Sequence, residues 1–304
     1  MKLAQIYAQA TRPVFSFEVF PPKTEIAYEN LKQVLPQLVG LRPDFMTVTY
    51  GALGSTQERT LEIATSIHRQ FQVETVCHLT CVGASRPQID QVLDRIRQEG
   101  IHNLVALRGD PPQGQSSFVP VANGFAHANE LVAHIRERER RLGLDPFGIG
   151  VAGYPEGHLE SPDLATDLLH LKRKVDAGAD MVVTQLFYDN RHFFRFEQAA
   201  RAAGILVPII PGLLPILSAK QILRITSLSR CEMPPDLLRE LETAGDDPAR
   251  AEAIGIRQTV QQAQELLGRG VPGIHFYVFN KATHLSRILQ ELRGSPQDQW
   301  HSQG

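Results

Sequence analysis

Residues 163–188 read DLATDLLHLKRKVDAGADMVVTQLFY, a helical pattern followed at once by a strand pattern. In the first half, apolar residues recur at the spacing of one helix face, and Gly178 is a typical helix terminator. The apolar positions are Leu164, Leu168, Leu171 and Val175. Residues 181–188 are rich in β-branched and aromatic residues, which predicts a strand. A helix that leads directly into a strand is typical of parallel α/β folds.

The same alternation runs from Phe15 to about Arg293. The segments with strand character are residues 15–20, 45–50, 74–82, 103–110, 147–154, 181–188, 208–215 and 273–280. Helical patterns separate them, and the long connection between the last two predicts two helices. These repeated units favour a closed (β/α)8 TIM barrel over an open doubly wound sheet, because no G-x-G-x-x-G motif follows the first strand. We therefore expect an α/β protein with one catalytic barrel over residues 1–294 and a polar tail over 295–304.

Composition and charge exclude several classes of protein. The chain of 304 residues has 31 Lys and Arg against 33 Asp and Glu, so its net charge of −2 offers no general attraction for nucleic acid or an anionic membrane. Neither a secretory signal nor a membrane span is evident. We expect a globular cytoplasmic protein whose partners are small molecules, with no nucleic acid and no membrane.

The three cysteines, Cys77, Cys81 and Cys231, lack the even number and the spacing of a disulfide framework or a zinc site. Buried thiols that pack as small apolar groups are the simpler interpretation. His78 lies in an apolar strand, and no second ligand stands beside it at metal spacing. We therefore expect no metal, and a hydrogen-bonded core histidine is the alternative to a functional His78.

Glu18 is an isolated acid in the predicted strand FSFEVF. In a barrel of this kind the chemistry lies at the carboxyl ends of the strands. Because side chains alternate along a strand, Glu18 should point into the barrel mouth when Phe15, Phe17 and Val19 face the helices. Partial burial would raise its pKa toward neutrality, so that it could donate a proton. The alternative is a structural Glu18 paired with an internal lysine or arginine.

Other polar residues also follow the predicted strands. Asp110 ends the run ALRGDPP, where a turn-stabilising role is the alternative to a functional one. Gln185 could serve core hydrogen bonding, or it could recognise the edge of a planar heterocycle. The helix after the fifth strand has a polar face that could hold a ribose and a diphosphate or could be a solvated surface. Its members are Asp167, His170, Arg173 and Lys174.

Taken together, these strand ends closely resemble those of the methylenetetrahydrofolate reductase family. The matching stretches are FSFEVFPPKT, VTYGALGSTQERT, HLTCVG, LVALRGDPP, AGYPEGHLES, LKRKVDAGADMVVTQLFYDN, PIIPGLLPI and GIHFYVFNKA. They cover almost the whole chain in family order. The chain is similar in length to the short bacterial form, which is the catalytic barrel without the regulatory domain of eukaryotic members.

The resemblance implies an FAD-dependent oxidoreductase of one-carbon metabolism, often dimeric or tetrameric. NADH or NADPH would reduce the flavin and then leave. 5,10-Methylenetetrahydrofolate would bind in place of the nucleotide and be reduced to 5-methyltetrahydrofolate. By resemblance, Glu18 is the general acid that opens the imidazolidine ring, and Asp110 stabilises the iminium cation and contacts the pterin. Gln185 and Lys281 would bind the folate. The implied FAD contacts are Thr49, Tyr50, His78, Arg108, Gly109, Asp110, His127, Ala128, Tyr154, His158, Asp167, His170, Arg173 and Lys174.

Some positions depart from the family pattern. His170 stands where some members have Asn, and His127 where many have Tyr. Ala219 stands where members carry an aromatic ring that packs on nicotinamide and folate. Lys281 replaces an arginine, which removes a bidentate fork but keeps a cation for the glutamate tail.

Two other functions compete with the reductase. One is a barrel flavoprotein that acts on another substrate, which would not need a proton donor at Glu18. The other is a catalytically silent paralogue that binds flavin or folate, and the joint presence of Glu18, Asp110 and Gln185 argues against it.

Overall fold

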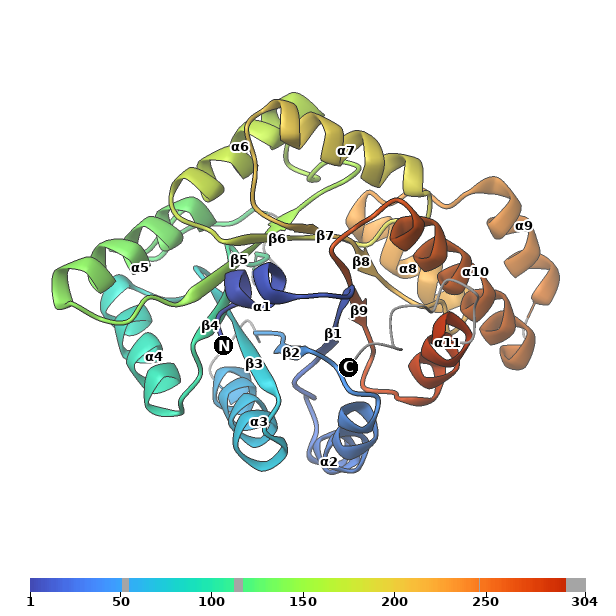
Figure 1. Ribbon diagram of the computed structural model, residues 1–304, viewed down its shortest axis with the longest axis horizontal. Helices are drawn as coiled ribbons and strands as arrows, with labels where there is room; N and C mark the ends of the chain where they lie inside the picture. The colour runs from blue at the N-terminus through green and yellow to red at the C-terminus, as the bar shows by residue number, and fades with distance from the viewer. Residues whose placement is uncertain (51–54, 112–116, 246, 294–304) are drawn as a thin grey trace.

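The strands of the computed structural model form one parallel sheet (Figure 1). They are β1 (Val14–Val19), β2 (Phe45–Val48), β3 (Glu74–Thr80), β4 (Asn103–Leu107), β5 (Gly148–Gly153), β6 (Met181–Thr184), β7 (Ile209–Ile210), β8 (Gly212–Leu213) and β9 (Gly273–Tyr277). The structure describes residues 1–50, 55–111, 117–245 and 247–293, without the side chains of 55–57, 219, 227, 228 and 293. The predicted polar tail, residues 295–304, lies outside the described residues.

The short strands β7 and β8 are two halves of the seventh predicted strand, and they close the sheet into a barrel. β7 pairs with β6, and β8 pairs with β9, which in turn pairs with β1. Pro211 separates the halves because it has no N–H for the ladder, but its carbonyl accepts from the backbone N–H of His275 at 3.0 Å. The predicted (β/α)8 barrel is confirmed.

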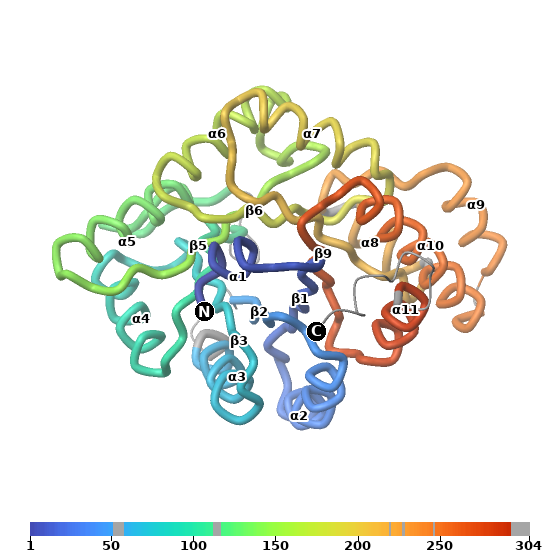
Figure 2. The backbone as a smooth tube through the Cα atoms, in the orientation of Figure 1, coloured from blue at the N-terminus to red at the C-terminus, as the bar shows by residue number. Residues whose placement is uncertain are grey.

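Helices surround the barrel on its outside (Figure 2). They are α2 (Glu25–Gly40), α3 (Ser55–Phe71), α4 (Arg86–Gln98), α5 (Ala128–Leu142), α6 (Leu164–Asp176), α7 (Asn190–Ala202), α8 (Ala219–Ser229), α9 (Pro235–Ala244), α10 (Pro248–Gly268) and α11 (Thr283–Arg293). The prediction of two helices before the last strand is wrong, because α8, α9 and α10 all lie there. The breaks fall at Pro234–Pro235, and after Ala244, where Gly245 adopts φ +56°. Among the described helices, none has the length and apolar character needed to cross a membrane.

Helix α6 follows the sequence pattern that predicted it. Asp163 caps its start by accepting a hydrogen bond from Thr166 N at 2.7 Å, and Gly178 turns the chain after its end with φ +115°. Leu171 is buried. Leu164 is half-exposed, unlike the rest of the predicted apolar stripe, because it is the first residue of the helix.

The interior of the barrel is apolar at its amino-terminal end. A short helix that the sequence pattern did not reveal, α1 (Leu3–Gln9), covers this end. Asn103 fixes α1, since its side chain accepts from Leu3 N and donates to the carbonyl of Met1, both at 2.8 Å. The apolar layer comprises Leu3, Ile6, Val14, Phe45, Val76, Val105, Met181, Val183 and Ile210. The carboxyl ends of the strands, near which Glu18 lies, are at the opposite end of the barrel.

Candidate active site

Glu18 lies on the inner face of β1, buried to 6% exposure among polar side chains from neighbouring strands. Thr49 Oγ1 donates to its Oε1 at 2.9 Å, and Thr47 Oγ1 donates to its Oε2 at 3.3 Å. His275 Nε2 lies 3.0 Å and His78 Nε2 3.4 Å from Oε2. The predicted inward direction is confirmed. These partners are histidines and threonines, not the internal lysine or arginine of the structural alternative.

His275 continues this contact into a buried chain of side chains. Its Nδ1 lies 2.8 Å from Ser16 Oγ, and both residues are essentially buried. With the Ser16 hydroxyl on one ring nitrogen and the carboxylate on the other, Nε2 carries the proton that faces Glu18. Sequence reasoning missed His275 and Ser16. Only the strand parity that Ser16 shares with Glu18 could be read from the sequence, because Ser16 and His275 meet through the register of β1 with β9.

The expected rise in the pKa of Glu18 is wrong. Burial alone would raise this pKa, but the charge of a protonated His78, together with His275 and the Thr49 hydroxyl, lowers it to about 2. Burial also lowers the pKa of His78, so its ring is neutral at pH 7 and its attraction acts only in acid. At neutral pH the carboxylate is held by hydrogen bonds, and Glu18 must gain a proton before it can act as an acid.

Glu18 and Asp110 belong to the same end of the barrel, because β1 to β4 are parallel. Asp110 is exposed there, beyond β4. Burial raises the pKa of Tyr277, and the charge of Glu18 adds to the rise. Burial also raises the pKa of Tyr154, and the charges of Asp167 and then Asp110 add to the rise. The two predicted catalytic carboxyl groups therefore share one end of the barrel, with Glu18 buried and Asp110 exposed.

The turn after β4 presents Arg108 and Gly109. Arg108 forms a forked ion pair with Glu160, with one contact at 2.7 Å, and its guanidinium lies 5.1 Å from the centre of the Phe118 ring. Gly109 has φ +88°, a conformation that side chains rarely allow. The guanidinium is thus held at the strand ends, where an anionic ligand would meet it.

The loop after β5 presents further expected cofactor residues. The rings of Tyr154 and His158 meet edge to face at 4.7 Å. Ser161 Oγ donates to the buried carboxylate of Asp167 at 3.0 Å. Lys174 donates to the Ala152 carbonyl, and burial lowers its pKa to about 8 although Asp167 opposes this. His170 and Arg173 lie exposed on the same helix.

Several polar atoms near the strand ends are buried without a hydrogen-bond partner in the described structure. They are Tyr50 Oη, both ring nitrogens of His78 and Thr80 Oγ1. Tyr50 and His78 also line a cavity of about 390 Å³ whose other walls come mainly from helices α3 and α4. Buried polar atoms normally have partners, so these atoms fit a polar ligand better than a satisfied core. The hydrogen-bonded core histidine, the alternative for His78, is not observed.

The remaining predicted positions are distributed around the same rim. Gln185 is half-buried, and its Oε1 accepts from Leu186 N at 2.9 Å, so the donor half of its amide is what it can offer a ligand. Asn280 bonds both backbone groups of Phe20, at 2.9 and 2.8 Å, and joins the loops after β1 and β9. The next residue, Lys281, is exposed.

Three further expectations concern the helices that follow the strands. His127 is exposed just before α5, and Ala128, the first residue of that helix, is buried. The side chain of Ala219 lies outside the described part of the structure.

Comparison with known proteins agrees with this architecture. Residues 2–293 match the family model described as methylenetetrahydrofolate reductase. The chain belongs to this family. It is 44% identical over 287 residues to methylenetetrahydrofolate reductase (NADH) 1 of Arabidopsis thaliana, which covers 91% of this chain and 48% of the relative. Identity to 5,10-methylenetetrahydrofolate reductase of Escherichia coli K12 is 34% over 294 residues, which covers 97% of this chain and 94% of that enzyme.

The chain spans about half the length of its plant relatives. Among solved structures, a protein from Clostridium thermocellum that binds two copies of 5-methyl-5,6,7,8-tetrahydrofolic acid matches with a TM-score of 0.61. The match covers 95% of this chain and 97% of the other at 15% identity, which supports the shared fold alone.

Proposed function

We propose that this protein reduces 5,10-methylenetetrahydrofolate to 5-methyltetrahydrofolate, with FAD as cofactor and NADH or NADPH as reductant. The observation that carries the proposal is the buried Glu18 carboxyl group at the mouth of a barrel whose other end is sealed. Membership of the methylenetetrahydrofolate reductase family supports the choice of substrate. A barrel flavoprotein without this proton chemistry would have no use for the Ser16–His275–Glu18 chain.

Glu18 would hold the proton that the folate needs. The imidazolidine ring opens when N10 takes a proton and its bond to the methylene carbon breaks, which leaves an iminium cation at N5. Entry of the folate would remove water from the barrel mouth and so raise the pKa of the buried carboxyl group. His275 Nε2 lies 3.0 Å from Glu18 Oε2. Because Nε2 already carries a proton, His275 would orient Glu18 as a donor, and the proton that the folate needs would bind the Glu18 carboxyl group itself.

Asp110 and Gln185 would act on the rest of the folate. The exposed carboxylate of Asp110 at the same end of the barrel would stabilise the iminium cation, since opposite charges attract strongly where water is excluded. The Gln185 amide would donate to a pterin acceptor, because its own oxygen is already bonded to Leu186 N. Lys281 would attract the carboxylates of the glutamate tail.

The residues present fit FAD. Arg108 and Lys174 would supply cations for a diphosphate, and Arg173, next to Lys174 on α6, is exposed. The unpartnered Tyr50 and His78 offer polar groups beside a cavity. When bound, FAD would accept a hydride from the reduced nicotinamide and pass it to the folate.

Anaerobic half-reactions test the proposal directly. The purified protein should be yellow, bleach with a reduced pyridine nucleotide, and regain its colour when methylenetetrahydrofolate is added. NADH and NADPH should be compared, with NADH first because the Arabidopsis relative carries NADH in its name. A protein that takes up no FAD would overturn the cofactor assignment. Bleaching without recovery on folate would indicate another substrate, and bound flavin that neither nucleotide reduces would indicate a silent paralogue.

A further inference from the structure

Two segments that are distant in sequence are fastened together beside the expected cofactor residues. The first is the loop after β5, residues 154–163, called here the cofactor loop because it carries Tyr154 and His158. The second is the turn between α8 and α9, residues 230–234, called the clasp turn. Arg230 of the clasp turn bonds to the cofactor loop, and Glu156 of the cofactor loop bonds to the clasp turn.

Arg230 holds the backbone of the cofactor loop. Its Nη1 donates to the carbonyl of His158 at 3.0 Å and to that of Ser161 at 3.3 Å. Both residues are tied to the expected cofactor set, because His158 packs on Tyr154 and Ser161 donates to Asp167. Arg230 itself adopts φ +56°, which is uncommon for a residue other than glycine. The Arg230 guanidinium thus holds the backbone of the cofactor loop at both His158 and Ser161.

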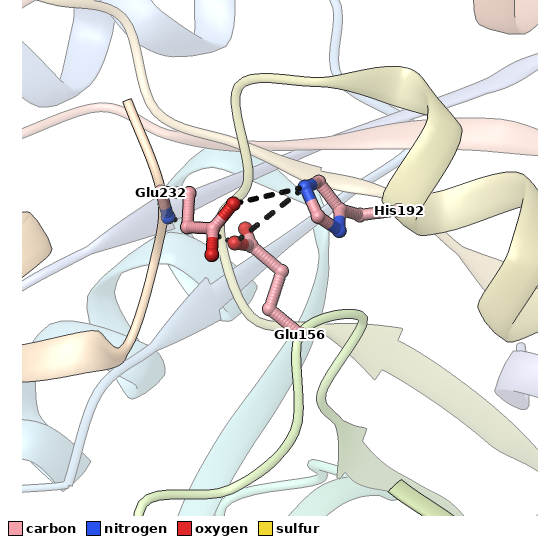
Figure 3. A group of neighbouring side chains, drawn as sticks. All are labelled: Glu156, His192 and Glu232. Atoms are coloured by element: carbon pink, nitrogen blue, oxygen red, sulfur yellow. Dashed lines mark hydrogen bonds and ion pairs between the residues drawn. The ribbon is translucent and has the colours of Figure 1, made fainter. Parts of the chain in front are cut away.

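Glu156 fastens the other side of the loop. Its side chain is only 8% exposed, and Oε2 accepts the backbone N–H of Glu232 at 2.8 Å. His192 Nε2 lies 3.8 Å from a carboxylate oxygen of each of Glu156 and Glu232, and Figure 3 shows the three side chains converging. The clasp turn therefore bonds to the cofactor loop at Glu156, His158 and Ser161.

The group Glu156, His192 and Glu232 has the composition of a metal site, but its hydrogen bonds indicate an anchor. Arg195 lies 2.9 Å from His192 Nδ1 and can only donate to it. The neutral ring then carries its proton on Nε2, which faces the two carboxylates. A metal would need a lone pair there, and its ligand histidine would normally donate from the other nitrogen.

We infer that Arg230 and Glu156 are positioning residues, which hold the cofactor loop so that Tyr154 and His158 are preorganised for FAD. The inference rests on the proposed FAD binding. Without the contacts of Arg230 and Glu156, the cofactor loop would become ordered only when FAD binds. The entropy lost in that ordering would lower the affinity for FAD.

The test measures the dissociation constant of FAD for the apoprotein, from the quenching of flavin fluorescence. Arg230→Ala should bind FAD about tenfold or more weakly, because two hydrogen bonds from a charged donor are lost. Arg230→Lys should recover part of the loss, since an ammonium group can still donate to a carbonyl. The matched control is Arg257→Ala, which removes an exposed arginine paired with Glu240 on α9 and should bind FAD within twofold of the wild type.

Two more measurements separate loop positioning from general destabilisation. The apoproteins of Arg230→Ala and Arg257→Ala should unfold at the same temperature. Glu156→Ala should also weaken FAD binding, and the double variant with Arg230→Ala should lose less than the product of the single losses, because both residues serve one clasp.

Arg230→Ala that binds FAD as the control does would overturn the inference, as would losses that multiply fully in the double variant. A wild-type protein that binds no FAD would overturn the proposed function as well.

Discussion

His275 Nε2 lies 3.0 Å from Glu18 Oε2, although the two residues are 257 positions apart in the chain. They meet because β9 pairs with β1 and so closes the barrel. Ser16 completes the chain of contacts from the same strand as Glu18. The candidate acid is therefore assembled by the same strand pairing that completes the fold, and the site cannot form in a partly closed sheet.

Glu18→Gln should separate the two half-reactions. The amide keeps the size of the side chain but has no acidic proton, so folate reduction should fall by roughly 10²- to 10⁴-fold, the usual contribution of a general acid. Flavin reduction by pyridine nucleotide should stay near the wild-type rate. Anaerobic stopped-flow absorbance measures each rate, with Glu29→Gln on α2 as an exposed control. Equal losses in both half-reactions would assign Glu18 a structural role.

Asp110→Asn should impair folate reduction more than it impairs FAD binding. The neutral amide removes the charge that would stabilise the iminium cation, while Arg108 keeps its own partner, Glu160. Stopped-flow rates and flavin fluorescence titration give the two quantities for the same preparation. An unchanged folate rate would remove Asp110 from the mechanism.

Most of the fold was predictable because strand and helix periods are local properties of the sequence. The inward direction of Glu18 followed from alternation along β1, a regularity that does not depend on the rest of the chain. Helix α1 escaped prediction because it is short, and its apolar residues Leu3 and Ile6 make sense only against the barrel floor that they cover. The split of the seventh strand at Pro211 is likewise a consequence of pairing with two different neighbours.

The pKa of Glu18 could not be predicted from its neighbours in sequence. Apolar residues flank it, and burial alone would raise its pKa. The groups that reverse the shift are His78 and His275, which arrive from β3 and β9. The register between distant strands therefore decides whether the pKa of Glu18 rises or falls, and a single sequence does not display that register.

FAD affinity should fall as pH rises through about 8, and Lys174 should be the cause. Burial lowers the pKa of Lys174 to about 8, so the apoprotein loses this positive charge above that pH. A diphosphate prefers the charged form, and proton linkage then predicts about tenfold weaker binding at pH 9 than at pH 7. Lys174→Met should bind weakly at both values, without this pH dependence. Arg173→Met is the matched control and should keep the dependence; fluorescence titrations that show an equal slope in both variants would contradict the assignment.

Gly212→Ala should destabilise the protein and disturb the site together. A Cβ at Gly212 would lie 2.3 Å from the carbonyl oxygen of Thr184 and 2.9 Å from the Tyr277 ring. The strand β8 cannot retreat freely, because Gly212 N donates to Thr184 Oγ1 at 2.9 Å and Gly212 pairs with His275. Overpacking at such a junction costs typically 1 to 3 kcal/mol or more, and we expect about 3 kcal/mol from urea unfolding.

Gly40→Ala is the control for this change, since a Cβ at the end of α2 meets nothing within 4 Å. It should leave the free energy of unfolding unchanged or raise it by up to about 1 kcal/mol. Because Gly212 faces the strand that carries His275, the Gly212→Ala variant should also reduce folate more slowly under conditions where it is fully folded. Equal urea midpoints for the two variants would mean that β6 and β9 are not held at the spacing that only glycine permits.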